Sequence, residues 1–125
     1  MTVSDESRRL ATIAALAADE KLGRDIAVLD VSDVMAISDV FVVASADNER
    51  QVGAIVEEVE DRLTEAGVEP LRREGNRENR WVLLDYGDFV VHVFLDETRE
   101  YYDLERLWSD VARVRWQDDP AEGAG

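Results

Sequence analysis

The stretch from Trp81 to Trp108 constrains the fold of this chain more than any other. It opens with two apolar runs, WVLLDY and DFVVHVF, which share a short turn around Gly87. Each run has the length of one strand, and Gly and Asp are common turn residues, so the pair predicts a β-hairpin. Because the runs are apolar at nearly every position instead of alternating, we expect the hairpin to lie inside a sheet that is covered on both faces.

Polar and aromatic residues interrupt the apolar pattern around this hairpin. Asp85 and Asp88 flank the predicted turn, and Glu100, Tyr101, Tyr102 and Asp103 follow the second strand. Carboxylates and tyrosines beside a rigid hairpin suit a binding surface. The alternative, solvated turn aspartates and half-buried tyrosines, is what composition alone favours, since exposed polar residues are mostly solvated.

Two amphipathic helices are expected before the hairpin. Ser4, with acids directly after it, resembles a helix N-cap, and Gly23 is expected to end this first helix at the C′ position. Asn48 is expected to cap a second helix that Gly67 ends. Apolar residues recur at three- and four-residue steps in both segments, which predicts packing on a sheet. The many alanines of the first helix leave open a contact with a second copy of the chain.

Three further strands are expected, at residues 26–31, 40–44 and 68–73. Pro70 places the last of these at an edge or gives it an irregular start, because proline cannot donate to a strand ladder. The order of helices and strands predicts an α/β fold: a single domain with a mixed β-sheet of about five strands and helices packed on its faces.

The C-terminal part is expected to add a short helix and an end-piece. Asp96 or Asp103 can cap the helix, and Val114 and Trp116 are expected to fold back onto the domain. We assign residues 1–116 to the single domain and expect residues 117–125 (QDDPAEGAG) to form a disordered acidic tail.

Charge and composition restrict the partners. The 125 residues include 29 acids and 14 basic residues, which gives a net charge of −15. Such a surface repels phosphate backbones and anionic membranes, so autonomous nucleic-acid binding is not expected and a basic protein partner is favoured. An acidic surface also keeps a protein soluble without any partner. No apolar run is long enough to span a membrane and there is no cysteine, so we expect a soluble cytoplasmic protein.

The residues support little catalytic chemistry. His92 is the only histidine and lies inside an apolar strand, where a packed, hydrogen-bonded role is favoured over catalysis. One histidine and no cysteine argue against zinc, and no G-x-S-x-G or phosphate-binding glycine motif is present. Asp85, Asp88 and Asp96 would need to converge to hold Mg²⁺ for nucleotidyl transfer. We therefore predict no catalytic residue, no metal site and no cofactor.

Three segments together resemble the ribosomal silencing factor family, RsfS, also called the Iojap or YbeB family. They occur in order, with family-like spacing, and cover most of positions 25–109. The combination W-x-L-x-D-Y-G-D-x-V-V-H-x-F followed by Y-D-L-E-x-L-W is specific to this family. The segments are DIAVLDVSDVMAISDVFVVASADNERQVGAIVEEVEDRL, RWVLLDYGDFVVHVFLDE and REYYDLERLW.

The resemblance implies a bacterial cytosolic homodimer with an α/β fold similar to nucleotidyltransferases, acting without known catalysis. Such a protein binds the large ribosomal subunit through its protein fourteen, sterically blocks joining of the small subunit and so represses translation, especially when nutrients are scarce. For Trp81 two roles stay open, a residue that contacts the partner and a residue of the hydrophobic core. Carried onto this chain, the implied partner-binding residues are Trp81, Asp85, Tyr86, Asp88, Tyr101, Tyr102, Asp103 and Glu105.

Two other functions stay open when the residues are taken without the resemblance. The first is a Mg²⁺-dependent, nucleotidyltransferase-like enzyme that uses the aspartates around the hairpin. The second is an acidic adaptor that recognises some other basic protein.

Overall fold

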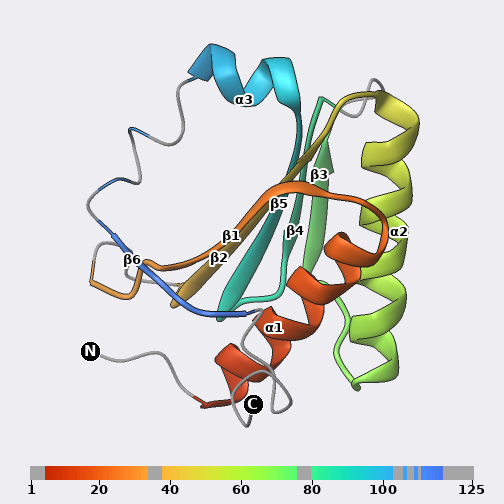
Figure 1. Ribbon diagram of the computed structural model, residues 1–125. Helices are drawn as coiled ribbons and strands as arrows, with labels where there is room; N and C mark the ends of the chain where they lie inside the picture. The colour runs from red at the N-terminus through yellow and green to blue at the C-terminus, as the bar shows by residue number, and fades with distance from the viewer. Residues whose placement is uncertain are drawn as a thin grey trace, which may run out of the picture.

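The computed structural model describes residues 5–33, 38–75, 80–102, 106, 109 and 111–116 (Figure 1). Three helices and six strands lie in these parts of the chain. In chain order they are α1 (Asp5–Glu20), β1 (Arg24–Asp30), β2 (Val40–Ala46), α2 (Glu49–Glu65), β3 (Arg72–Gly75), β4 (Trp81–Asp85), β5 (Phe89–Leu95), α3 (Asp96–Tyr102) and β6 (Ala112–Arg113).

The strands form one mixed sheet in the order β3-β4-β5-β2-β1-β6. The central pair, β2 and β5, is parallel, and every other neighbouring pair is antiparallel. The predicted single α/β domain with a mixed sheet is confirmed. The sheet has six strands rather than about five, because the two-residue β6 is too short to leave a periodic signal in the sequence.

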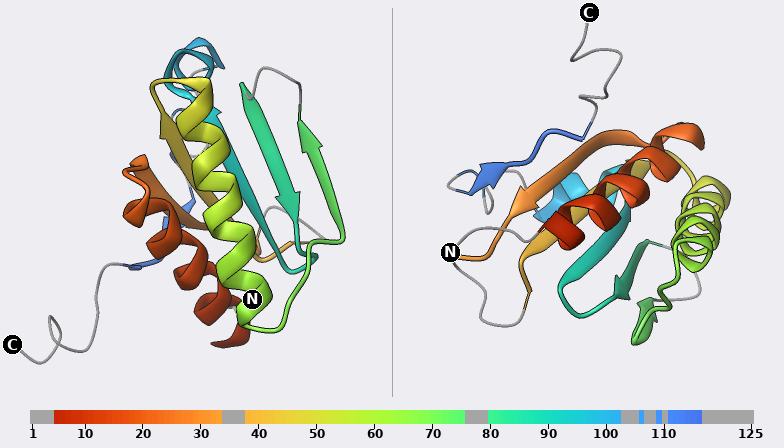
Figure 2. Two further views of the ribbon diagram at one scale, coloured as in Figure 1. Left: turned by 90° about the vertical axis from the view of Figure 1, so that its right-hand side faces the viewer. Right: turned by 90° about the horizontal axis from the view of Figure 1, so that it is seen from below.

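The two long helices lie side by side on the same face of the sheet, as both views in Figure 2 show. Between them and the sheet lies the main hydrophobic core. Ala11, Ala14 and Ala18 of α1 are buried in it, and their small side chains let the backbone of α1 approach its neighbours closely. The core-facing interpretation of α1 is therefore confirmed, and these alanines are not available for a contact with a second copy.

The hairpin of β4 and β5 forms as predicted, with Gly87 in the turn at φ +90°. All seven residues of β5 are buried, as expected for a strand covered on both faces. The same expectation is wrong for β4, where Val82 and Leu84 are buried but Trp81 and Leu83 are only half-buried. Only the exposed edge strand β3 separates β4 from the rim of the sheet, so β4 is covered fully on the helix side alone.

Two of the predicted helix ends are confirmed and one is corrected, while Ser4, the predicted N-cap of α1, lies outside the described residues. Asn48 caps α2, since its side-chain oxygen accepts a hydrogen bond from the backbone N–H of Gln51 at 2.8 Å. Gly67 follows α2 at φ +96°, the left-handed C′ position that was predicted. At the end of α1 this position is taken by Leu22 at φ 63°, and Gly23 comes one residue later. Glycine is needed there for another reason, because a Cβ on Gly23 would lie 2.9 Å from the carbonyl oxygen of Ala18.

The strand predicted at 68–73 begins later, at Arg72, and runs to Gly75. Its predicted edge position is confirmed. The backbone N–H of Val68 is occupied in capping α2, where it donates to the carbonyl of Leu63 at 3.0 Å. Ladder pairing can therefore begin only after Pro70, and Leu71 makes the first such contact by donating to the carbonyl of Asp85 at 2.7 Å.

The described end of the chain returns to the sheet. Val114 donates to the carbonyl of Val28 at 2.7 Å, and Val114 and Trp116 pack against the main core, so the predicted end-piece is confirmed. α3 begins at Asp96; Asp103, the other predicted cap, and the tail 117–125 lie outside the described residues. No helix in the described part of the chain has the length and apolar character needed to cross a lipid bilayer.

Candidate functional site

The face of the sheet opposite α1 and α2 carries a cluster of rings. Strand alternation places Phe41 of β2, Trp81 of β4, and His92 and Phe94 of β5 on this side, and we call it the aromatic face. The ring centroids of Trp81 and Phe94 are 4.8 Å apart, and those of Phe41 and His92 are 4.7 Å apart in an edge-on arrangement. Three separate strands thus build one continuous ring surface.

His92 is the buried centre of the aromatic face. The indole N–H of Trp81 donates to its Nδ1 at 3.2 Å, which leaves the ring proton on Nε2 in the neutral form. Burial lowers the pKa of His92 to about 4, because the charged imidazolium is poorly solvated among aromatic rings. His92 is therefore neutral at physiological pH, and its predicted role as a packed, hydrogen-bonded residue is confirmed.

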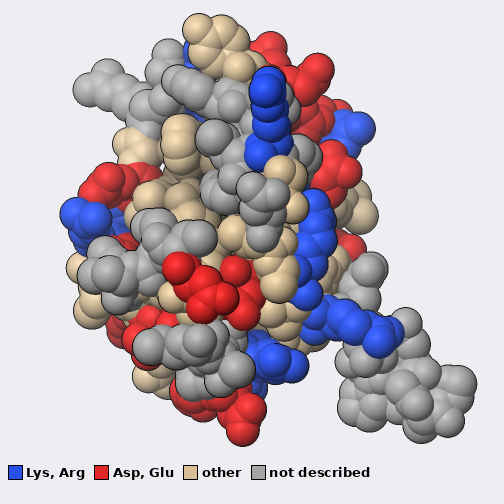
Figure 3. Space-filling view, turned by 90° about the vertical axis from the view of Figure 1, so that its left-hand side faces the viewer, with Lys and Arg blue, Asp and Glu red and all other residues tan. Residues whose placement is uncertain are grey.

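The neighbours of His92 reach the surface. Phe41, Trp81 and Leu83 are half-buried, so each has one side in the cluster and another side accessible. Figure 3 looks onto the side of the molecule away from α2: among the residues that it colours by type, uncharged ones lie near the middle, a group of acids lies below them, and basic side chains lie along one side. Trp81 is both a core residue, through Phe94 and His92, and a partly accessible aromatic.

One end of the aromatic face is the hairpin turn. Asp85 stabilises this turn. One of its carboxylate oxygens accepts a hydrogen bond from the backbone N–H of Gly87 at 2.8 Å, and the other lies 3.3 Å from Nε of Arg72. Tyr86 packs against the main core, with its ring stacked on Phe89 at 4.8 Å, and burial raises the pKa of its hydroxyl. Asp88 is exposed. Of the predicted contact residues in the turn, Asp88 is the most accessible.

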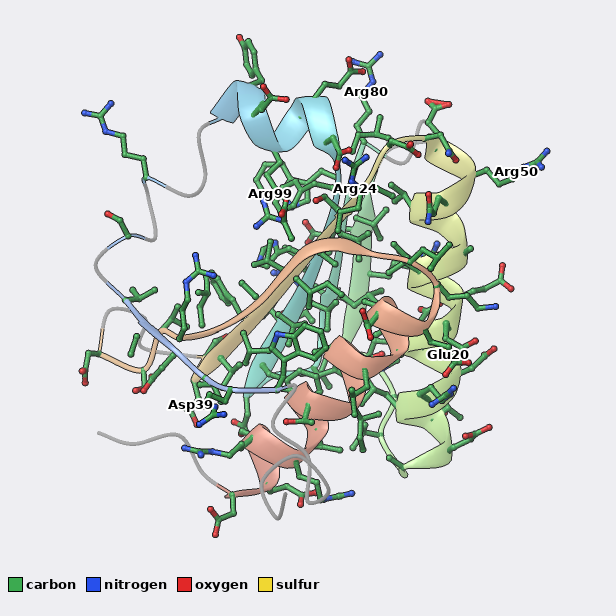
Figure 4. The ribbon with its side chains drawn as sticks, viewed as in Figure 1. Glu20, Arg24, Asp39, Arg50, Arg80 and Arg99 are labelled. Atoms are coloured by element: carbon green, nitrogen blue, oxygen red, sulfur yellow. The ribbon has the colours of Figure 1, made fainter. Side chains whose placement is uncertain are left out.

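The other end of the aromatic face is α3, which two arginines fix in place. The buried guanidinium of Arg99 donates to the hydroxyl of Ser45 at 3.1 Å, and that hydroxyl in turn donates to the backbone carbonyl of Arg24 at 3.1 Å. Arg24 also forms an ion pair with Asp96 at 3.0 Å. Figure 4 shows Arg24 and Arg99 converging under α3. Tyr101, on the outer side of this helix, is 81% exposed.

The predicted contact residues therefore fall into two groups. Asp85, Tyr86 and Asp88 lie before the first residue of β5, whereas α3 follows its last residue. Seven residues of strand separate the groups by about 20 Å. Trp81 is paired with Phe94 and so lies nearer the α3 end, with Tyr101. The side chain of Tyr102, and Asp103 and Glu105, lie outside the described residues.

The same separation bears on the enzyme alternative. Asp96 lies at the α3 end, while Asp85 and Asp88 lie at the turn, so the three carboxylates do not converge. The described residues contain no group of three or more histidines, aspartates or glutamates placed to share a metal ion. The geometry that a Mg²⁺ site on these aspartates would need is not formed.

A charged cleft of about 470 Å³ opens where the parallel strands β2 and β5 end. Ligands often bind at this place in α/β sheets, but here the rim is predominantly acidic, which favours cationic groups. Sequence reasoning missed Arg24, Ser45 and Arg99, whose contacts hold α3 to strands β1 and β2. It also missed Phe41 and Phe94 as members of the aromatic face. Both alternate with valines along their strands, and this period of two was the signal that could have placed them on one face. The cleft is lined by Asp47, Asn48, Glu49, Arg80, Leu95, Asp96, Glu97 and Glu100.

Comparison with known proteins decides the family. Residues 4–124 match the family model described as ribosomal silencing factor during starvation. The chain is also 43% identical over 99 residues to the ribosomal silencing factor RsfS of Bacillus subtilis, an alignment that covers 79% of this chain and 84% of that protein. This chain belongs to the ribosomal silencing factor family. The resemblance seen in the sequence is thereby confirmed.

The fold of this chain is also found in a solved relative. A crystal structure of a Chromobacterium violaceum protein aligns with it at a TM-score of 0.78 and 34% sequence identity, over 100% of both chains. A mouse protein named mitochondrial assembly of ribosomal large subunit protein 1 is 35% identical over 89 residues, which are 69% of this chain and 39% of the mouse protein. The chain is thus similar in sequence to a protein whose name refers to the large ribosomal subunit.

Proposed function

We propose that this silencing factor docks on the large ribosomal subunit through its protein fourteen and sterically blocks joining of the small subunit, which represses translation, especially under nutrient limitation. Family membership is the observation that carries the proposal. The name of the mouse relative supports the choice of the large subunit. Blocking by occupancy needs no catalytic group, in keeping with the separated aspartates.

The physical basis of docking is a partly apolar face on an acidic body. Trp81 offers accessible aromatic surface, Tyr101 extends from α3, and Asp88 lies at the turn. Aromatic residues supply buried contact area in protein interfaces, and carboxylates pair with lysines and arginines of a basic partner. The acidic cleft beside α3 strengthens the preference for a cationic protein surface. A ribosomal protein satisfies both requirements better than naked RNA does.

The remaining expectations complete the proposal. The protein acts in the cytoplasm as a homodimer, without a cofactor, as the resemblance to the family implies. Leu16 of α1 and Leu71 before β3 are large apolar side chains at the surface, 45% and 74% exposed, and they supply apolar area for contact with a second copy.

Co-sedimentation with purified large subunits tests the docking surface. Tyr101→Ala and Asp88→Lys should each weaken binding about fivefold or more, because each removes or reverses a contact at one end of the aromatic face. Asp61→Lys is the matched control: Asp61 is exposed on α2 and the charge change is the same, so its binding should stay at the wild-type level. Failure of the wild-type protein to enter the large-subunit fraction contradicts the proposal.

The two groups of contact residues can be told apart in the same assay. If only Tyr101→Ala weakens binding, the contact lies at the α3 end of the aromatic face. If only Asp88→Lys does, it lies at the hairpin turn. If neither variant differs from Asp61→Lys, the contact residues implied by the resemblance are wrong for this chain, although large-subunit binding itself stands.

A further inference from the structure

The short helix α3 is joined to the sheet by a polar side chain instead of an apolar stripe. Of the side chains that the structure describes in α3, only that of Arg99 is buried. A helix of seven residues is too short to be stable by itself in water, so its orientation depends on contacts with the rest of the protein. The other described side chains of α3 are half-buried or exposed: Asp96, Glu97, Thr98, Glu100 and Tyr101.

Ser45 is the residue that Arg99 reaches. The guanidinium of Arg99 donates to the hydroxyl of Ser45 at 3.1 Å. Ser45 is fully buried on β2, and its hydroxyl donates in turn to the backbone carbonyl of Arg24, the first residue of β1, at 3.1 Å. One hydroxyl therefore links α3 to two strands of the sheet. In the strand register Ser45 lies opposite Phe94, which places this link at the α3 end of the aromatic face.

A second contact joins the same two parts of the protein. The side chain of Arg24 forms an ion pair with Asp96 at 3.0 Å. Because Asp96 and Arg99 are three residues apart, they lie on the same side of α3, and Figure 4 shows Arg24 and Arg99 beneath this helix. The ion pair is partly exposed, and solvent weakens it, whereas the hydrogen bond between Arg99 and Ser45 is shielded from water. The buried hydrogen bond therefore has the larger influence on the orientation of α3.

Tyr101 lies on the opposite side of the same helix. It follows Arg99 by two residues, which is about 200° around an α-helix, and it is 81% exposed. A rotation of α3 by about 30° about its axis would move a side chain on its outer surface by about 3 Å. A displacement of that size is enough to break a hydrogen bond or a van der Waals contact with a docked partner. The contact that fixes Arg99 therefore also fixes the position of Tyr101.

We propose that Ser45 and Arg99 are positioning residues for docking on the large ribosomal subunit, because their buried hydrogen bond fixes the orientation in which α3 presents Tyr101 to the partner. The inference rests on the proposed function, and neither residue is among the contact residues that the family resemblance implies. A helix that is already oriented loses less conformational entropy when the partner binds, so it binds more tightly than a helix that is free to rotate.

A purely structural role is the alternative. The hydrogen bond would then contribute to the free energy of unfolding and would have no influence on docking. The two roles differ in how they depend on Tyr101. A positioning contact acts through the tyrosine, so its loss changes the affinity only while the tyrosine is present. The effect of a structural contact on affinity is the same with the tyrosine and without it.

A double-mutant cycle of large-subunit affinity tests the proposal. Ser45→Ala removes the hydroxyl that accepts from Arg99, and it should weaken binding about threefold or more in the otherwise wild-type protein. In the Tyr101→Ala background the same substitution should change the affinity by less than about 1.5-fold. Equal fold-changes in the two backgrounds overturn the proposal, and so does an unchanged affinity of the Ser45→Ala protein.

Ser38→Ala is the matched control. Ser38 is also buried, and its hydroxyl also donates to a backbone carbonyl at 3.1 Å, that of Gly87 at the hairpin turn. About 20 Å of extended chain separates Ser38 from Ser45, so Ser38 is remote from α3. Whatever its effect on affinity, Ser38→Ala should act equally with and without Tyr101, since distant sites are additive. Coupling to Tyr101 of equal size at both serines would report a general loosening of the fold and overturn the assignment.

Arg99 supplies a second pair of variants. Arg99→Met keeps the length of the side chain but removes every donor, whereas Arg99→Lys keeps a charged donor. Binding of the Arg99→Lys protein should be closer to the wild-type level than binding of the Arg99→Met protein. A urea unfolding curve establishes that each variant is folded in the binding assay. If Ser45→Ala is not folded, the Arg99 pair is decisive, and equal weakening by both variants overturns the role of the hydrogen bond.

The single variants separate this inference from the proposed function. If the wild-type protein does not bind large subunits, the proposed function fails and the inference fails with it. If the wild type binds and Tyr101→Ala binds equally well, Tyr101 is not a contact residue, and the inference alone is overturned. Binding that is weakened by Tyr101→Ala and by Ser45→Ala, but no further by the two together, supports the inference.

Discussion

Lowering the pH should destabilise this protein in part through one buried side chain, His92. Burial in the aromatic face holds the pKa of His92 at about 4, whereas an unfolded chain restores its ordinary value of 6.5. Between these two values the unfolded state binds a proton that the folded state does not. Stability from this group is therefore complete above pH 6.5, falls as the pH is lowered toward 4, and changes no further below that.

The size of the effect follows from the two pKa values. The shift of His92 is worth about 3 kcal/mol when it is fully expressed, at about 1.4 kcal/mol for each pH unit. At about pH 5 roughly 2 kcal/mol of this should be lost relative to neutral pH. That is a large share of the 5–15 kcal/mol by which domains of this kind are typically stable.

Urea unfolding at about pH 7 and about pH 5, followed by tryptophan fluorescence, measures the loss. The control is His92→Gln, which removes the titrating group but keeps an oxygen that can accept from the indole of Trp81. Carboxylates also titrate in this range, but they do so in both proteins, so the difference between the two pH dependences isolates His92. We expect the wild type to lose about 2 kcal/mol more than the variant.

An equal loss in both proteins would refute the reasoning, since it would mean that His92 titrates at the same pH whether the chain is folded or not. Proton NMR gives an independent check on the wild type alone. The chain has one histidine, so its ring resonance is unambiguous, and it should shift with a midpoint near pH 4 in the folded protein.

Three further substitutions probe the local structure by urea unfolding. Asn48→Ala should lower the unfolding free energy by about 1 kcal/mol through loss of the α2 cap, and Asn48→Asp should not. Gly87→Ala should cost about 1–2 kcal/mol, because the turn needs φ +90°. Ser45→Ala should cost about 1–3 kcal/mol, because buried Arg99 loses the hydroxyl to which it donates. An unchanged midpoint would contradict the corresponding contact.

Local sequence signals predicted most of the elements. The Asn48 cap and the Gly67 terminus gave the bounds of α2 closely, because both act within one helical turn. The two apolar runs on either side of Gly87 predicted the hairpin, because its two strands are also close in the sequence. Leu22 in the left-handed position was not predictable in this way, since the close approach of Gly23 to Ala18, which shapes this helix end, is visible only in three dimensions.

The candidate site was harder to predict, because it depends on strand order and register. Phe41 and His92 are 51 positions apart in the sequence and meet only because β2 and β5 pair in parallel, with Val43 opposite His92. The residues implied by the family resemblance were adjacent in the sequence at both ends of β5, and one strand length places them about 20 Å apart.

Subunit joining is the measurement that tests the central claim most directly. Purified large subunits, pre-incubated with this protein, are mixed with small subunits and separated on a sucrose gradient. Occupancy of the joining surface predicts that the fraction of joined ribosomes falls as the protein concentration rises, with the protein in the large-subunit fraction. Undiminished joining while the protein remains bound to the large subunit would contradict the account.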